Sequence, residues 1–283
     1  MNYLSLPSLG MSDFRRLGSY IHTELGIKMP DAKRGMVESR LRKRLNVLNI
    51  SSYKAYCDYL FSPQGQKEEL PFFINQITTN KTDFFRESKQ FVFLKRTALP
   101  ELLFSVPTGE LKKLNIWSAA CSRGHEPYSL AMVLSEYARQ HKNMDFSILG
   151  TDISTQVLSA AQKAVYAHEE IEPVPMVLRK KYLLRSKDRR KNMVRIVPEL
   201  RSKVRLLRLN LMNQRYAGIE RMDIIFCRNV MIYFEKQTQY QILDRLLTHL
   251  KPGGFLFMGH SEVLQHAELP LKSIQTTIYQ KNK

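Results

Sequence analysis

The 283-residue sequence has few cysteines and no spacing that would pair them. Its three cysteines, Cys57, Cys121 and Cys227, are far apart, and no CxxC pair is present. An odd number of scattered cysteines argues against a disulfide framework and against a zinc site. We therefore expect three reduced thiols and no bound metal.

Long apolar runs are also missing. No segment approaches the ~18 consecutive apolar residues of a membrane-spanning helix, and the N-terminus has no signal-peptide pattern. The sequence has neither internal repeats nor low-complexity tracts. Its 43% hydrophobic and 25% charged residues are ordinary for a soluble globular protein. We expect a cytoplasmic protein of one large domain or two modest ones.

Negative charge is scarce, because 26 Asp and Glu stand against 44 Lys and Arg, which leaves a net charge of +18. Such a charge is typical of a protein that approaches an acidic partner, either protein or nucleic acid. It is also compatible with a surface that only serves solubility. The clustering of the basic residues favours a partner.

The N-terminal third predicts consecutive helices and no strand. Apolar residues recur at helical spacing throughout residues 11–77. The first helix has Ser12 as its N-cap, a second spans about 32–48, a third begins near Ser52, and a fourth covers about 64–77. This part of the chain is expected to be a small helical domain.

The second of these helices carries a cluster of basic residues. At ~100° per residue they fall within one wedge, which we expect to lie opposite the apolar stripe. The cluster consists of Lys33, Arg40, Lys43 and Arg44. It is either a solvated helix face or a docking surface for an acidic partner.

Short apolar strands then alternate with helices, which predicts an α/β fold with a doubly wound, Rossmann-like parallel sheet and helices on both faces. The strands are expected at residues 114–118, 146–150, 204–207, 224–227, 255–258 and 276–280. We expect a helical domain at 1–90, a linker at 91–110 and the α/β domain at 111–283. A charge-rich turn between apolar flanks predicts an inserted β-hairpin subdomain at about 165–205.

Polar residues follow the first strand of this domain. The turn contains only Gly124, so the GxGxxG fingerprint is absent, which argues against a pyrophosphate cofactor such as NAD. Glu126 occupies the same turn, and a carboxylate repels phosphate and attracts an ammonium group. Glu126 can alternatively serve as a first-turn acid that complements the helix dipole.

Two further polar tips follow later strands. Asp152 comes directly after the second strand, where an acid commonly accepts hydrogen bonds from ribose hydroxyls, although it can also cap the following helix. Residues 227–229 (Cys-Arg-Asn) follow another strand. The expected ligand has a ribose and a cationic or amino-acid end but no phosphates, and S-adenosylmethionine fits this description.

Four segments together resemble the motifs of the bacterial chemotaxis receptor methyltransferases (CheR type). They are 77–87 (Ile-Thr-Thr-Asn-Lys-Thr-Asp-Phe-Phe-Arg-Glu), 117–129 (Trp-Ser-Ala-Ala-Cys-Ser-Arg-Gly-His-Glu-Pro-Tyr-Ser), 226–234 (Phe-Cys-Arg-Asn-Val-Met-Ile-Tyr-Phe) and 259–262 (Gly-His-Ser-Glu). The first alone also reads as a capped helix start. The resemblance implies a helical N-terminal domain on a class I S-adenosylmethionine-dependent methyltransferase domain. It implies methyl transfer to chemoreceptor glutamates, which yields γ-methyl esters and S-adenosylhomocysteine.

The resemblance also implies the residues of the site. The cofactor-contacting residues would be Asn80, Thr82, Arg86, Glu126, Asp152, Asn210, Leu211, Arg228 and Asn229. Among these, Glu126 would hold the amino end of the methionine moiety and Asp152 the ribose, while Asn210 and Leu211 would flank the adenine. For catalysis, we expect Arg86 to orient the incoming carboxylate and Tyr233 to shape the pocket.

The expected partners are the acidic cytoplasmic helices of chemoreceptors, docked by Lys33, Arg40, Lys43 and Arg44. We expect no nucleic acid partner, no insertion into the membrane that holds the receptors, and a monomer. Two alternatives stay open. One is an RNA methyltransferase. An Asn-Pro-Pro-Tyr-like tip would favour this alternative, but the sequence has no such tip. The other is a non-catalytic module that senses S-adenosylmethionine.

The chain departs from the family pattern in two places. His125 stands where members often have a second acid, which leaves Glu126 as the sole carboxylate of its turn. The turn at 186–191 contains no glycine, whereas members that dock a C-terminal receptor pentapeptide tend to carry glycines there. We therefore expect methylation that is independent of a pentapeptide tether.

Overall fold

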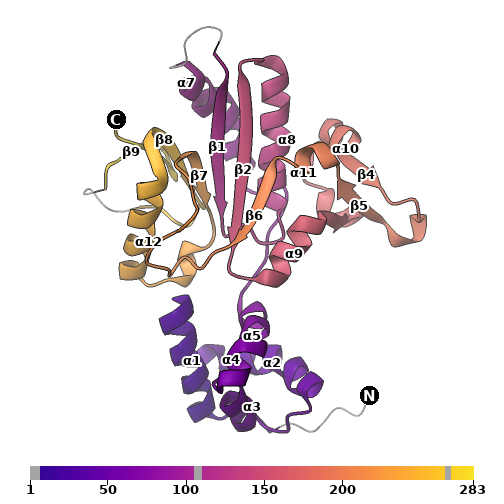
Figure 1. Cartoon of the computed structure of the whole chain (residues 1–283), viewed down its shortest axis with the longest axis vertical. Helices are drawn as coiled ribbons and strands as arrows, with labels where there is room; N and C mark the ends of the chain where they lie inside the picture. Colours follow the sequence, from indigo (N-terminus) through magenta and orange to yellow (C-terminus); the bar gives the residue numbers. More distant parts are fainter. Residues whose placement is uncertain (1–6, 105–109, 265–268) are drawn as a thin grey trace. The chain divides into compact units, whose positions relative to one another are not determined.

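The computed structural model describes residues 7–104, 110–264 and 269–283, and it divides into two compact units (Figure 1). The helical unit comprises the described residues up to Thr79 together with Asn210–Met212 and Tyr233–Thr238. The sheet unit comprises Asn80–Leu209, Asn213–Ile232 and the described residues of Gln239–Lys283. A helical N-terminal unit and an α/β unit with a mostly parallel sheet confirm the expected fold class.

The helical unit is built from short amphipathic helices. They are α1 (Met11–Leu25), η1 (Asp31–Lys33), α2 (Arg34–Leu48), α3 (Tyr53–Leu60), α4 (Pro63–Glu68) and α5 (Leu70–Ile77). Ser52 caps α3 as expected, whereas α1 begins at Met11 with Gly10, not Ser12, as its N-cap. The single helix expected at 64–77 is broken at Glu69, because Pro71 has no N–H to continue the ladder and instead sits in the first turn of α5.

The basic wedge of α2 differs from the expectation. Arg44 donates from Nε and Nη2 to the buried carboxylate of Glu69 at 2.8 and 2.6 Å. Arg40 donates from Nη1 to the carbonyl oxygens of Ile77 at 2.5 Å and Thr78 at 3.2 Å. Arg44 follows Val37 by seven residues, about 700°, so it lies within about 20° of the apolar stripe rather than opposite it.

Of the four basic residues, only Lys43 is exposed, while Lys33 lies in the η1 turn and donates from Nζ to the carbonyl oxygen of Lys28 at 2.8 Å. Arg40 and Arg44 therefore hold the helical unit together.

The sheet unit is organised around a seven-stranded sheet of order β6-β2-β1-β7-β8-β10-β9. Its strands are β1 (Lys112–Ala119), β2 (Met144–Asp152), β6 (Val204–Arg208), β7 (Met222–Cys227), β8 (Leu250–Met258), β9 (Leu271–Gln275) and β10 (Ile278–Lys281). The first five strands in this order are parallel, and β10 and β9 run antiparallel. The strand order reverses between β1 and β7, and open α/β sheets bind ligands outside the carboxyl ends at such a switch point.

Helices α8 (His125–Gln140) and α9 (Thr155–Lys163) follow β1 and β2, and α12 (Lys236–His249) precedes β8. Strand β9 was not expected from the sequence. Its residues are half-buried or exposed, so they lack the apolar alternation that marks a strand with one buried face.

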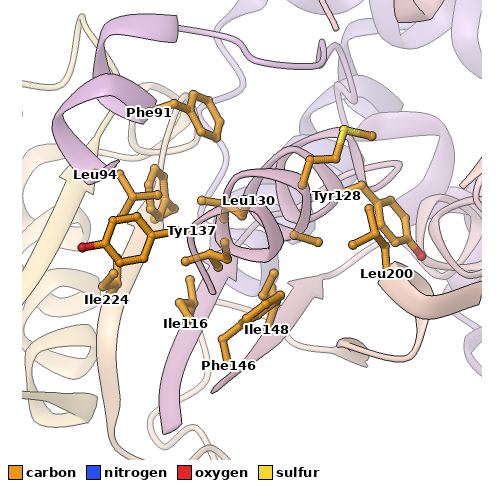
Figure 2. Packing of buried hydrophobic residues seen from close by; sticks show 14 of the residues in the cluster. Phe91, Leu94, Ile116, Tyr128, Leu130, Tyr137, Phe146, Ile148, Leu200 and Ile224 are labelled. Atoms are coloured by element: carbon orange, nitrogen blue, oxygen red, sulfur yellow. The ribbon is translucent and has the colours of Figure 1, made fainter. Parts of the chain in front are cut away.

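The segment expected to be a linker, residues 91–110, is helical in its described part. Residues up to 104 form α6 (Ser88–Phe93), η2 (Leu94–Ala98) and α7 (Leu99–Phe104). The apolar residues Phe91, Leu94 and Ala98 recur at intervals of three and four, so one face of this segment is buried in the core of the sheet unit. Figure 2 shows Leu94 in the same part of that core as Ile224 of β7.

The insertion forms a separate three-stranded antiparallel sheet of order β3-β5-β4. Its elements are β3 (Val165–Ala167), η3 (His168–Ile171), α10 (Met176–Tyr182), β4 (Leu183–Arg185), η4 (Arg189–Lys191), β5 (Met193–Ile196) and α11 (Pro198–Arg201). Tyr166, Tyr182 and Ile196 anchor it to the core, while β4 and β5 project at the right of the view (Figure 1). No helix in the described part of the chain is long and apolar enough to span a membrane.

Candidate active site

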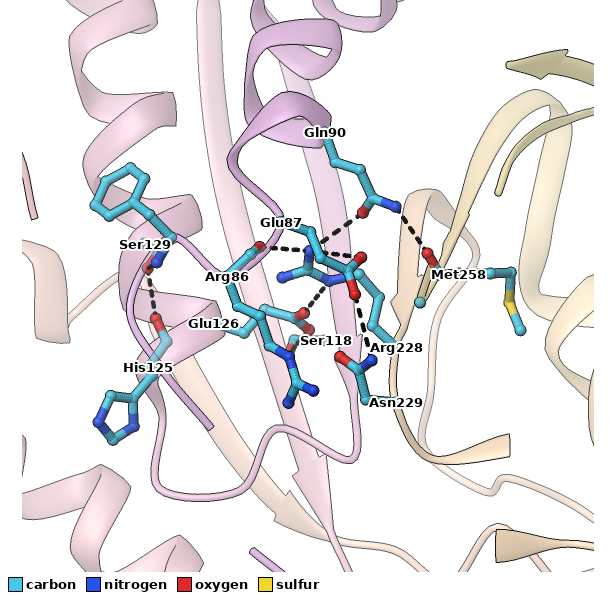
Figure 3. Close-up of polar contacts among 12 residues, drawn as sticks. Arg86, Glu87, Gln90, Ser118, His125, Glu126, Ser129, Arg228, Asn229 and Met258 are labelled. Atoms are coloured by element: carbon cyan, nitrogen blue, oxygen red, sulfur yellow. Dashed lines mark hydrogen bonds and ion pairs between the residues drawn. The ribbon is translucent and has the colours of Figure 1, made fainter. Parts of the chain in front are cut away.

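A buried arginine lies at the switch point of the sheet. Arg228 follows β7 directly, and its side chain is 2% exposed. Its Nε donates to Oε2 of Glu126 at 2.6 Å, and its Nη1 donates to the carbonyl oxygen of Arg86 at 2.7 Å and to Oε1 of Gln90 at 3.2 Å (Figure 3). Nη1 also lies 3.5 Å from Oε2 of Glu87. We call Arg228, Glu87, Gln90 and Glu126 the Arg228 cluster.

Glu126 is positioned by the turn between β1 and α8. Gly124 precedes α8 with a φ of 89°, and a Cβ at this position would lie 2.9 Å from the Cβ of Ala161, so the turn requires glycine. Glu126 thus lies in the first turn of α8, where a carboxylate also complements the helix dipole. Ser118 of β1 donates from Oγ to Oε1 of Glu126 at 2.6 Å. The carboxylate is fixed between Ser118 and Arg228.

The segment before α6 contributes a second carboxylate and a strained backbone. Glu87 has a φ of 59° and Phe85 a φ of 52°, and left-handed backbone at non-glycine residues costs on the order of 1 kcal/mol or more each. Oε1 of Glu87 accepts hydrogen bonds from Nδ2 of Asn229 and from the backbone N–H of His260, each at 3.2 Å. Oε2 is buried and has no hydrogen-bond partner. Sequence reasoning included Glu87 in a motif but gave it no role.

Asp152 ends β2 and is held by the backbone. Its two carboxylate oxygens accept hydrogen bonds from the N–H groups of Ser122 and Ser154, each at 2.9 Å. Burial raises the pKa of Asp152, and these hydrogen bonds oppose the rise. The side chain of Ser154 caps α9, because its Oγ accepts a hydrogen bond from the N–H of Val157 at 3.3 Å. The N-cap of α9 is therefore Ser154 and not Asp152, which was the alternative role considered for Asp152.

Glu262 is a structural centre of the site that sequence reasoning did not single out. Its carboxylate accepts hydrogen bonds from the backbone N–H groups of Asn229, Gly259, Met231 and Ile232 at 2.7, 2.8, 2.8 and 3.4 Å. A Cβ at Gly259 would lie 2.6 Å from Oε2 of Glu262, so this position requires glycine. The sequence feature that could have indicated this role is the spacing Gly-x-x-Glu directly after a buried strand.

The structure brings the expected residues together only in part. Arg228, Glu126 and Asn229 lie in one hydrogen-bonded network with Glu87. Arg86 and Asn80 contribute backbone carbonyl oxygens to the site. That of Arg86 accepts a hydrogen bond from Nη1 of Arg228, and that of Asn80 accepts one from Oγ of Ser122 at 2.9 Å.

The remaining expected residues are placed elsewhere. Thr82 is half-buried in the sheet unit. Asn210, Leu211 and Tyr233 belong to the helical unit, where Nδ2 of Asn210 donates to the carbonyl oxygen of Glu24 at 2.7 Å. The side chain of Arg86 is half-buried, and its Nη1 donates to the carbonyl oxygen of Lys81 at 3.3 Å.

These groups fit S-adenosylmethionine. The Arg228 cluster contains two carboxylates and one guanidinium, and one buried carboxylate oxygen of Glu87 has no hydrogen-bond donor. Such a site favours a ligand with positively charged groups, as the ammonium and sulfonium of S-adenosylmethionine are. Asp152 provides a buried carboxylate at the position where ribose hydroxyls bind in folds of this kind.

Comparison with known proteins identifies the class. The family model described as "CheR methyltransferase, SAM binding domain" matches residues 80–280, and "CheR methyltransferase, all-alpha domain" matches residues 12–78. The chain is therefore an S-adenosylmethionine-dependent methyltransferase. It belongs to the CheR methyltransferase family of chemotaxis, as its motifs predicted.

Curated relatives agree over nearly the full length. A chemotaxis protein methyltransferase of Borreliella burgdorferi is 35% identical over 95% of this chain and 94% of its own length. Chemotaxis protein methyltransferase 2 of Pseudomonas aeruginosa is 38% identical over 94% and 92%. A chemotaxis protein methyltransferase of Escherichia coli is 38% identical over 97% and 93%.

Proposed function

We propose that this chain transfers methyl groups to glutamate side chains of chemoreceptors and forms glutamyl γ-methyl esters. The family match over both units, with relatives named chemotaxis protein methyltransferases, carries this proposal. The buried Arg228 cluster at the switch point supports it, because it supplies the charges that a sulfonium cofactor requires.

The chemistry asks for positioning rather than for a general base. S-adenosylmethionine supplies an electrophilic methyl group on a sulfonium and leaves as a neutral thioether. A glutamate side chain is already ionised at neutral pH, since its reference pKa is ~4.3, so no residue has to remove a proton. The tasks left to the chain are to orient the acceptor carboxylate and to exclude water from it.

We assign these tasks to particular residues. Arg86 orients the acceptor carboxylate; the residue is half-buried and lies in the strained segment whose backbone binds Arg228. Asn229 and Tyr233 shape the acceptor pocket. Glu126 holds the ammonium group of the cofactor and Asp152 its ribose.

Asn80, Thr82, Asn210 and Leu211 complete the proposed cofactor contacts, with Asn210 and Leu211 flanking the adenine. Replacing Arg86 by alanine should lower kcat/KM about thirtyfold or more, since a lost charged hydrogen bond costs about 2 kcal/mol. Full activity of this variant would remove Arg86 from the mechanism.

The proposed partner is the acidic helical bundle of a chemoreceptor, met in the cytoplasm by a monomer. We propose that η1 and α2 dock this bundle through Lys33 and Lys43, since Arg40 and Arg44 are bound within the helical unit. Reversing the charge of Lys43 to glutamate should slow receptor methylation at low salt and leave the rate at high salt unchanged. An equal rate at low salt would exclude Lys43 from docking.

We also propose that methylation does not require a receptor pentapeptide tether. The turn between β4 and β5 contains the short η4 helix and no glycine. Removal of the receptor's C-terminal tail should therefore leave the initial rate of methylation within about twofold, well under the 1.4 kcal/mol of a tenfold change.

The decisive experiment is methyl transfer from radiolabelled S-adenosylmethionine into chemoreceptor-containing membranes, followed by mild base. Base-labile label on the receptor supports carboxyl methylation, because esters hydrolyse under conditions that spare N-methyl groups. Label that resists base, or label on RNA and none on receptor, would overturn the proposal.

A further inference from the structure

The turn between β1 and α8 has a strained backbone. Ala120 has a φ of 60° and Ser122 a φ of 49°, a left-handed conformation that residues other than glycine rarely adopt. Such a conformation persists only where the surrounding structure holds it. The turn leads directly into α8 and so determines where Glu126 lies, the residue that we assign to the ammonium group of the cofactor. The contacts that hold the turn therefore also hold this carboxylate.

The tip of β2 holds the first half of the turn. The N–H of Cys121 donates to the carbonyl oxygen of Thr151 at 2.8 Å, and the N–H of Ser122 donates to the carboxylate of Asp152 at 2.9 Å. The turn thus joins the two acids that we assign to the cofactor, because Asp152 binds its backbone and Glu126 follows it in the chain.

The inserted subdomain holds the second half of the turn. The hydroxyl of Tyr166 in β3 donates to the carbonyl oxygen of Arg123 at 2.8 Å. The carboxylate of Glu170 in η3 accepts hydrogen bonds from Nη1 and Nη2 of Arg123 at 2.7 and 3.3 Å. Oε2 of Glu170 also accepts the N–H of Ala167 at 2.9 Å, which fixes the carboxylate within the insertion. The insertion therefore binds Arg123 through both its backbone and its side chain.

His125 adds a third contact between the turn and the insertion. Its Nε2 lies 3.3 Å from Oε1 of Glu170. Figure 3 shows the ring of His125 pointing away from Arg228, whereas the carboxylate of Glu126 points toward it. An acid at position 125 would repel Glu170, so this contact arises where the chain departs from the family pattern.

We propose that the inserted subdomain is part of the cofactor site and that Glu170 is a positioning residue for it. By binding Arg123 and His125, Glu170 holds the strained turn in the conformation that places Glu126 and Asp152 for the cofactor. The inference rests on the proposed roles of these two acids and is independent of the methyl acceptor. S-adenosylmethionine and S-adenosylhomocysteine share the amino-acid end and the ribose, so both should depend on Glu170 equally.

The test is the variant Glu170→Gln, which removes the charge but keeps an oxygen for the N–H of Ala167. Calorimetric titration with S-adenosylmethionine and with S-adenosylhomocysteine gives both the dissociation constant and the fraction of molecules that bind. Both constants should rise about fivefold at an unchanged binding fraction, since a partly exposed ion pair contributes up to about this factor. Unchanged constants would overturn the proposal, and a lower binding fraction alongside them would show that Glu170 only stabilises the fold.

Variants of Arg123 test whether the effect passes through this pair. Arg123→Gln should raise both constants as Glu170→Gln does, and the double variant should add little, because the same interaction is already lost. Arg123→Lys keeps a charge for Glu170 and should stay within about twofold of the parent protein. A double variant whose increase equals the product of the two single increases would overturn the proposal.

Two further variants complete the set. Tyr166→Phe removes only the hydroxyl that binds the turn, so it also serves if Glu170→Gln fails to fold. It should raise both constants about threefold, as expected for one neutral hydrogen bond, and parental constants would contradict the role of the insertion. Glu169→Gln changes an exposed neighbour in η3 and should leave both constants unchanged.

Glu126→Gln separates this inference from the proposed site. If Glu126→Gln weakens binding of both ligands and Glu170→Gln does not, the positioning role of Glu170 fails while the role of Glu126 stands. If Glu126→Gln binds both ligands as the parent does, the assignment of Glu126 fails and the inference fails with it. Because no acceptor protein is present in these titrations, their outcome is separate from the question of whether glutamate is the methyl acceptor.

Discussion

The carboxylate of Glu262 accepts the backbone N–H of Asn229 at 2.7 Å, and this hydrogen bond joins the tips of β8 and β7. Asn229 has a φ of 59°, so the chain turns sharply directly after Arg228. The same carboxylate accepts the N–H groups of Gly259 and Met231. The orientation of Arg228 toward Glu126 therefore depends on an acid more than thirty residues further along the chain.

Replacing Glu262 by alanine should destabilise the sheet unit by about 3 kcal/mol. Several buried N–H groups lose their acceptor at a cost of about 1–3 kcal/mol each, and water that enters the space replaces part of these hydrogen bonds. The fluorescence of Trp117, the only tryptophan and fully buried in β1, reports urea unfolding of this unit. Glu220→Ala, at an exposed position of the same unit, is the control and should unfold as the parent does. If Glu262→Ala unfolds at the same urea concentration as the parent protein, the hydrogen bonds of Glu262 do not stabilise the ends of β7 and β8.

Arg228 should not tolerate lysine. Lysine keeps the charge but offers a single donor centre, so the bonds to Glu126, Gln90 and the carbonyl oxygen of Arg86 cannot all be made. We expect kcat/KM to fall about a hundredfold or more, which corresponds to about 2.7 kcal/mol. Arg221→Lys, an exposed arginine just before β7, serves as control, and equal activity of both variants would contradict the geometric requirement.

The pair of Arg44 and Glu69 should decide the stability of the helical unit. Glu69 is 1% exposed and also accepts a hydrogen bond from the hydroxyl of Tyr56 at 2.9 Å. Glu69→Ala leaves Arg44 without its partner, and breaking a largely buried pair from one side costs about 3–5 kcal/mol, here at the lower end because Arg44 is 18% exposed.

Circular dichroism should show an early loss of helix in Glu69→Ala, while the Trp117 signal of the sheet unit keeps its midpoint. Lys43→Glu is the matched surface variant on the same helix and should melt as the parent does. If the circular dichroism signal of Glu69→Ala is lost at the same temperature as that of the parent protein, the pair of Arg44 and Glu69 contributes little to the stability of the helical unit.

Much of the fold could be predicted from local pattern. The apolar strands β1, β2 and β7 and the helical spacing of α1 and α3 are properties of short segments, and the structure has them where the sequence placed them. The motifs also predicted the family and the cofactor, because four segments at fixed order are specific even when each alone is ambiguous.

The sequence could not show the pairings that join distant segments. Arg44 was expected on an exposed basic wedge that docks an acidic partner, and only the fold reveals Glu69 as its partner. Glu87 and Glu262 stood inside motifs without a role, because an acid gives no sign in the sequence of whether a guanidinium, a backbone N–H or no donor faces it. Residues 91–110 were expected to be a linker without its own helices, since short helices broken by a change of helical pitch lack the long periodicity of a buried helix.

His125 should make the protein sensitive to mild acid. It lies next to Glu126 in α8 and is 1% exposed, packed against the rings of Phe84 and Tyr166 with centroids 4.6 and 4.8 Å away. Its Nδ1 is buried without a partner. Burial lowers the pKa of His125 from 6.5 to about 4, although Glu170 at 3.3 Å from Nε2 opposes this shift.

Because the folded-state pKa of His125 is depressed, the unfolded chain binds the proton more tightly, and stability is lost as the pH falls from the unfolded pKa toward the folded one. Between pH 7 and pH 5 this group alone should lower the free energy of unfolding by about 2 kcal/mol. His125→Phe keeps a planar ring among the same aromatic neighbours and cannot be protonated, so its loss over this interval should be smaller by about that amount. His168→Gln, which removes a half-buried histidine of the η3 turn, should follow the parent. Parallel pH curves for His125→Phe and the parent protein would show that His125 is protonated equally in both states.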